Sequence, residues 1–125
     1  MFYCDKIEGI DVLRRNISQD MQYISKFNEI LEISYKKDYD IDKCDYISNI
    51  EFIISDRQCR YTIKLFFYNV KGDFSFDINN GFYGALNIED CSEWGYEKPY
   101  SFRISSADQN LYFSMYCEKI RAELI

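Results

Sequence analysis

Apolar and polar residues alternate along most of the chain after residue 27, which is the pattern of half-buried β-strands. Turn-type residues separate the alternating runs, and the tripeptide DRQ (56–58) joins two of them as in a β-hairpin. The segment KKDYDIDKCD (36–45) has the composition of a charged turn or loop. Seven runs predict strands: 29–35, 46–55, 59–70, 72–78, 83–91, 100–106 and 111–124.

A different period precedes these runs, because apolar residues recur there mostly at three- and four-residue steps. This spacing places them on one side of an amphipathic helix over roughly residues 10–27. Asn16 and Ser18 are poor residues for a helix interior, and Ser18 with Asp20 could begin a second short helix. A continuous helix and a broken helix therefore both remain open. The apolar positions are Ile10, Leu13, Ile17, Met21, Ile24 and Leu31.

The composition also favours a sheet. Twelve Tyr and ten Phe, against one Pro and five Gly, suit pleated and half-buried surfaces. The length of 125 residues is typical of one domain. We therefore expect a mainly β protein, with a single domain over 1–125 and short helical structure in its first 27 residues. Its form would be an antiparallel β-sandwich or a strongly bent sheet of about seven strands.

Two of the predicted strands carry aromatic side chains on both faces. In the run 59–70, Phe66 and Tyr68 lie on the face opposite to Leu65 and Phe67. In the run 111–118, two tyrosines lie opposite the apolar set in the same way. Tyrosine combines a large apolar area with a polar end and is enriched in binding surfaces. These second faces either contact a partner or pack against another layer of the protein.

Charge narrows the choice of partner. Fifteen Lys and Arg against twenty-one Asp and Glu give a net charge of −6. Such a surface repels phosphate backbones, so we expect no nucleic-acid partner, and it favours encounter with a basic protein.

Location is predicted from the absence of targeting signals and from the cysteines. The start of the chain lacks the segments of a signal peptide, and no stretch approaches the ~18 apolar residues of a membrane span. The five cysteines include no C-x-x-C pair. We expect a cytoplasmic protein with reduced thiols and no membrane partner.

Catalytic motifs are missing from the sequence. The chain has no histidine, which removes the commonest general base and the histidine metal sites. Asp38, Asp40 and Asp42 have the spacing that begins a calcium loop. Lys43 and Asn49, however, stand where such a loop needs glycine and glutamate. We therefore expect no enzyme activity, no metal and no cofactor, and a carboxylate-only enzyme is the weakest of three hypotheses.

The segment 89–97 combines acids with the only tryptophan of the chain. Trp94 is either an anchor inside a buried loop or a central contact of an interface. The acids of this segment would speed encounter with a basic partner. The partner-binding residues expected from the sequence are Glu89, Asp90, Glu93, Trp94, Tyr96, Glu97, Tyr112 and Tyr116.

Four pieces of the C-terminal half occur in a distinctive order: LFFYNV (65–70), IED (88–90), YSFRI (100–104) and LYFSMYC (111–117). In this order they resemble small, mostly β immunity proteins of bacterial polymorphic toxin systems, over residues 62–124. The chain departs from that family before the last strand, where ADQN (107–110) replaces Asp-Tyr-Glu.

The resemblance implies a bacterial, cytoplasmic protein that binds and blocks a cognate toxin domain made by the same cell. Such toxins are often basic, which suits the acidic surface of this chain. The alternative hypothesis is a small β-sandwich or barrel that binds an apolar or aromatic ligand in its interior. A homodimer is left open.

Overall fold

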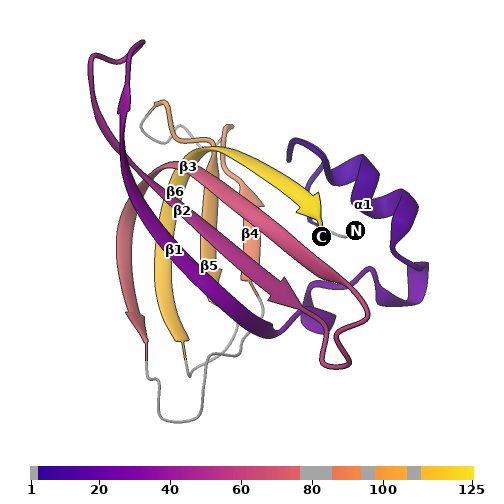
Figure 1. The fold of residues 1–125 in the computed structure, drawn as a ribbon. Coiled ribbons are helices and arrows are strands. Elements are labelled where there is room, and N and C mark those ends of the chain that lie inside the picture. Colours follow the sequence, from indigo (N-terminus) through magenta and orange to yellow (C-terminus); the bar gives the residue numbers. More distant parts are fainter. Residues whose placement is uncertain (1–2, 77–85, 94–97, 107–110) are drawn as a thin grey trace.

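The computed structural model describes residues 3–76, 86–93, 98–106 and 111–125, which form one antiparallel sheet with short helices before it (Figure 1). The strand order is β1-β2-β3-β6-β5-β4, so β1 and β4 are the edges of the described sheet. The expectation of a mainly β protein is confirmed. The strands are β1 (Glu29–Asp40), β2 (Asp45–Ser55), β3 (Thr62–Phe76), β4 (Leu86–Asp90), β5 (Phe102–Ser106) and β6 (Leu111–Leu124).

Two of the expected strands are a single strand in the structure. The runs 59–70 and 72–78 both contribute to β3, which pairs with β6 in one register from Ile63 to Phe76. Gly72 therefore does not end a strand. A Cβ atom at Gly72 would lie 2.2 Å from the backbone oxygen of Ser114 in β6, so glycine allows the two backbones to approach. The described strands number six, and all belong to one sheet.

Replacing Gly72 by alanine is expected to destabilise the protein by about 2 kcal/mol. The new Cβ would overlap the backbone oxygen of Ser114, and the φ of 145° at this position is one that alanine rarely adopts. Urea denaturation measures the change in the free energy of unfolding. Ser75→Ala, at an exposed position of the same strand, is the control and should change it little. Equal stability of the two variants would contradict the close approach.

β3 bends back over one face of the sheet. The ring of Phe52 in β2 lies 5.6 Å from that of Phe67 and 6.3 Å from that of Phe74, between centroids. Phe74 follows Phe67 by seven residues, which in a straight strand would separate them by ~23 Å. One ring can contact both only because β3 curves between them. The described sheet is therefore strongly curved, with Phe52 and Phe67 in its core and Phe74, partly buried, packed against them.

The bend lies where the buried side chains of β3 and β6 switch from one face of the strand to the other. Met115 and Cys117 are buried in β6, and so are Ile120 and Ala122, so the alternation slips by one residue after Cys117. In β3, Asn69 has a φ of 57°, which is a left-handed conformation. Because side chains alternate strictly in a regular strand, this slip marks a bend.

The N-terminal region is broken into three short helices, so the second of the two helix alternatives is right. They are α1 (Ile10–Asn16), η1 (Gln19–Met21) and η2 (Ile24–Lys26). Ser18 is the N-cap residue of η1, as expected for a restart at this position. α1 lies beside the C-terminal end of β6 and contacts it (Figure 1). The backbone of Glu8, just before α1, bonds to Ile120 and Ala122 of β6.

Candidate functional site

Two of the acids predicted from the sequence are paired within the molecule. Asp90 lies at the end of β4, where its Oδ2 is 2.9 Å from the Nζ of Lys6. Its Oδ1 accepts hydrogen bonds from the backbone nitrogen and the hydroxyl of Ser92. Glu89 is ion-paired with Arg103 of β5, with 3.1 Å between Oε1 and Nη1. These contacts neutralise part of the acidic surface that the sequence predicted.

Asp90 should make folding stability depend on pH. The hydrogen bonds from Ser92 and Lys6 lower the pKa of this carboxyl to about 2. Because this value lies below that of an unfolded aspartate, ~3.9, the stabilisation is complete above pH 4 to 5 and is lost as the pH falls towards 2. Asp90→Asn should therefore lower the free energy of unfolding at pH 7, and the gap to the parent should close near pH 2.

Urea denaturation at both pH values measures this gap. Asp20→Asn is the matched control, because Asp20 is exposed and forms no ion pair among the described residues. A gap for Asp90→Asn that stays the same at both pH values would show that the carboxylate does not contribute through its charge.

The other predicted residues are only partly described. Trp94, Tyr96 and Glu97 lie outside the described residues, as does the side chain of Tyr112. Glu93 is exposed, and Tyr116 is half-buried in β6. The sheet register brings Tyr116 beside Arg103 of β5 and Lys71 of β3, so Glu89, Arg103, Tyr116 and Lys71 form one row across four strands. The row carries both signs of charge, and the sequence pattern did not predict its two cations.

A two-stranded arm projects from the sheet at the end of the β1–β2 hairpin. β2 pairs with β3 only from Ile50 to Ser55, whereas its pairing with β1 continues to Asp45. Residues 36–49, which we call the arm, therefore extend beyond the other strands (Figure 1). The sequence predicted a charged loop over 36–45, but most of that segment is strand, and only residues 41–44 form the turn.

One face of the arm is fastened to the body of the protein. The side chain of Asn49, only 4% exposed, donates to Asp38 and accepts a hydrogen bond from the backbone nitrogen of Asn69. The hydroxyl of Tyr68 donates to Asp40, and this bond raises the pKa of Tyr68 to about 12 and lowers that of Asp40. The partners on the body, Tyr68 and Asn69, both lie at the bend of β3. They hold the arm in one orientation.

A second tie fastens the turn of the arm. The Nζ of Lys43 lies 2.7 Å from the Oε1 of Glu118 in β6, and this hydrogen bond raises the pKa of Lys43. Lys43 belongs to the turn, so the free end of the arm is also tied to the bend of the sheet. Asp38 and Asp40 are thus engaged by side chains of the protein rather than arranged as ligands around an ion.

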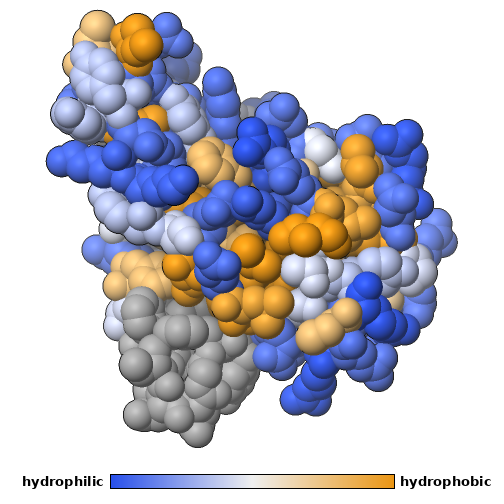
Figure 2. Space-filling model, in the orientation of Figure 1, coloured by the Kyte–Doolittle hydropathy of each residue, from blue (hydrophilic) through white to orange (hydrophobic). Residues whose placement is uncertain are grey.

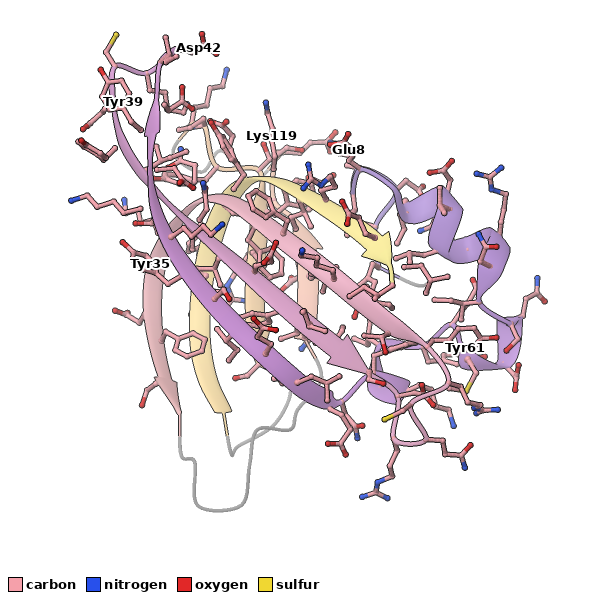
Figure 3. The ribbon with its side chains drawn as sticks, viewed as in Figure 1. Glu8, Tyr35, Tyr39, Asp42, Tyr61 and Lys119 are labelled. Carbon is pink, nitrogen blue, oxygen red and sulfur yellow. The ribbon has the colours of Figure 1, made fainter. Side chains whose placement is uncertain are left out.

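The opposite face of the β1–β2 hairpin exposes three tyrosines, two on the arm and Tyr35 directly before it, which we call the tyrosine ladder. Tyr35 is 62% exposed, Tyr39 55% and Tyr46 59%. The rings of Tyr39 and Tyr46 meet edge to face at 5.2 Å, and the Nζ of Lys37 lies 5.2 Å from the centroid of Tyr46. The hydroxyl of Tyr35 is 3.0 Å from that of Ser48. Figure 3 shows Tyr35 and Tyr39 along the same margin of the molecule.

The tyrosine ladder continues the face of the sheet that forms the core. In the register of β1 and β2, Tyr35 pairs with Ile50, and two residues further into the body Ile33 pairs with Phe52. Phe52 is fully buried, whereas the ladder is exposed. The turn adds Ile41, which is 80% exposed, and Figure 2 shows an apolar spot at the end of the arm. An apolar face that leaves the body in this way is suited to contact another molecule.

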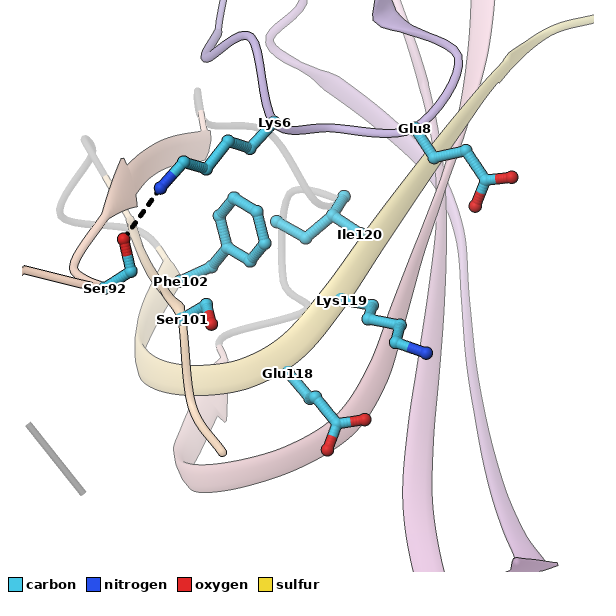
Figure 4. Close-up of a pocket in the computed structure, with 8 residues that line it drawn as sticks. All are labelled: Lys6, Glu8, Ser92, Ser101, Phe102, Glu118, Lys119 and Ile120. Atoms are coloured by element: carbon cyan, nitrogen blue, oxygen red, sulfur yellow. Dashed lines mark hydrogen bonds between the residues drawn. The ribbon is translucent and has the colours of Figure 1, made fainter. Parts of the chain in front are cut away.

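Two neighbouring hollows are lined in part by β6, at the bend and just after it. One, of about 350 Å³, is lined by Lys6, Glu8, Ser92, Ser101, Phe102, Glu118, Lys119 and Ile120 (Figure 4). The second, of about 310 Å³, shares Glu8, Lys119 and Ile120 with it. Lys6 donates to Ser92 across the first hollow, and Glu118 is held by Lys43. Both hollows are open and lined by charges of both signs, so they do not favour an apolar ligand.

The described residues include no group of three or more Cys, Asp or Glu that could hold a metal ion. None of the described helices is long and apolar enough to cross a membrane. Cys117 is fully buried in β6, and burial raises the pKa of its thiol. A raised thiol pKa disfavours the reactive thiolate.

Comparison with protein-family models, with curated proteins and with solved structures finds no match for this chain.

Proposed function

We propose that this chain is a toxin-neutralising immunity protein, which binds and blocks a cognate bacterial toxin domain and carries out no catalysis itself. The proposal joins the resemblance of residues 62–124 to the geometry of the arm. The tyrosine ladder is the observation that carries it. Three exposed tyrosines on a fastened support offer contact area with little loss of side-chain entropy on binding.

Charge supports a basic partner. Asp42 and Asp45 are exposed at the end of the arm, beside Tyr46, and the whole chain has a net charge of −6. Acidic groups around an aromatic patch speed the approach of a basic protein, while the apolar rings set how long it stays bound. A toxin blocked in this way is covered rather than chemically altered, so the immunity protein needs no catalytic group.

The proposal is tested with the protein encoded immediately upstream of this chain. Cells that express the toxin domain of that protein should survive when they also express this chain, and the two purified proteins should bind in surface plasmon resonance. An unrelated acidic protein of similar size is the control for protection by charge alone. If the chain neither binds that toxin nor protects the cells, the proposal is wrong for this pair. The ligand-binding alternative then moves ahead.

A further inference from the structure

β1 is a long edge strand with one open side. It has twelve residues, of which all but the bulge residue Leu31 pair with β2 on one side, and no other strand of the described residues pairs with it. An edge of this length presents a row of unpaired backbone donors and acceptors, which is a template for another strand.

The five residues 32–36 of β1 are complementary to their own reverse about Ser34. Glu32 and Lys36 lie two residues to either side of Ser34, and Ile33 and Tyr35 lie one residue to either side. In an antiparallel pair centred on Ser34, each glutamate therefore faces a lysine and each isoleucine faces a tyrosine. Opposite charges and aromatic–β-branched pairs are the cross-strand combinations that stabilise a sheet.

We propose that β1 pairs antiparallel with β1 of a second copy of this chain, about a two-fold axis at Ser34. The pairing joins two sheets edge to edge and closes after two copies, because each open edge is used by the other. Glu32 of each copy faces Lys36 of the other. The inference does not depend on a toxin partner.

The two charges are available for this contact. Glu32 accepts a hydrogen bond from Ser34 at 3.3 Å, and neither Glu32 nor Lys36 has an ion-pair partner among the described residues. Lys43 in the turn of the same hairpin is, by contrast, already engaged by Glu118. The open edge thus keeps one acid and one base at the spacing that a second copy would match.

The shape of β1 limits where pairing can occur. A β-bulge lies between Ile30 and Glu32, and the register from Glu32 to Asp40 is regular. Bulges and lysines usually protect an edge against unwanted strands. Here the bulge ends the regular segment just before Glu32, and the lysine meets a glutamate only when the incoming strand has the sequence of β1. Edge pairing leaves both faces of the sheet uncovered, so Tyr39 and Tyr46 of the tyrosine ladder stay accessible.

The proposal is tested by sedimentation over a series of protein concentrations. The parent protein should associate to a dimer. Glu32→Lys and Lys36→Glu each place like charges opposite one another twice in the dimer, so each should weaken association by at least about tenfold. The double variant Glu32→Lys/Lys36→Glu exchanges the two charges and should restore it. Asp20→Lys makes the same change of charge away from β1 and should leave association unchanged.

Cross-linking tests the register. Directly opposite residues of an antiparallel pair have Cα atoms about 4.5–5.5 Å apart, within the range of a disulfide. In a background with Cys44→Ser and Cys59→Ser, Ser34→Cys should form a covalent dimer with oxidised glutathione, and Lys37→Cys, which keeps both Glu32–Lys36 pairs, should not. A parent that stays monomeric across the series overturns the proposal. So does a double variant that does not recover, or equal cross-linking at both positions.

Discussion

Replacing Phe52 by alanine should lower the free energy of unfolding by about 3–5 kcal/mol. Phe52 is fully buried, and its ring meets those of Phe67 and Phe74 edge to face or nearly so. These rings stand on the two sides of the bend in β3, so Phe52 joins parts of the sheet that are far apart along the strand. Its removal leaves a cavity at the point where the curvature is held. Urea denaturation at neutral pH measures the loss.

The control for this change is Tyr46→Ala in the same strand. Tyr46 is 59% exposed, so its removal should change the free energy of unfolding by only about 0.5 kcal/mol. Phe52→Leu fills most of the space and should lie between the two. If Phe52→Ala costs less than about 1 kcal/mol, the bend of β3 does not depend on this contact, and the packing described for the core is wrong.

Alternation along the sequence predicted which residues of a strand point inward, because that pattern is local. Leu65 and Phe67 were expected on one face of their strand, and both are fully buried. Alternation did not predict where a strand bends or ends. The runs 59–70 and 72–78 were expected as two strands, yet Gly72 lies inside the single strand β3, where the backbone of β6 approaches it. Such an approach depends on residues about forty positions away, which no local pattern records.

In the candidate site, too, local sequence patterns did not predict contacts between residues far apart in the chain. The charges of segment 36–45 suggested a loop, and the tyrosine ladder forms only because the hairpin register places Tyr39 opposite Tyr46. The alternation of Tyr35, Lys37 and Tyr39 before a short turn is a signal that could have predicted it. The ion pairs that neutralise Glu89 and Asp90 come from Arg103 and Lys6, which are distant in sequence. The expected roles of Trp94, Tyr96 and Glu97 stay predictions.

Removing the tyrosine ladder should weaken binding to the toxin more than any change in the segment 89–97. If Tyr39 and Tyr46 are the central contacts, Tyr39→Ala and Tyr46→Ala should each cost about 2 kcal/mol or more, close to a 30-fold loss of affinity. The loss should appear as faster dissociation, because buried apolar contacts act on the off-rate. Tyr39→Phe keeps the ring and should bind nearly as the parent does. Surface plasmon resonance against the toxin domain measures these rates.

The same experiment separates the effect of charge on the association rate from the effect of direct contacts on the dissociation rate. Glu93→Gln removes an exposed acid of the predicted loop and should only slow association, by an amount that shrinks as salt shortens the Debye length below ~8 Å. Tyr23→Ala is the matched control for the arm, since Tyr23 is 59% exposed but lies in the N-terminal region. If the arm variants bind like the parent while changes in 89–97 speed dissociation, the loop is the interface. In that case the ladder has another role.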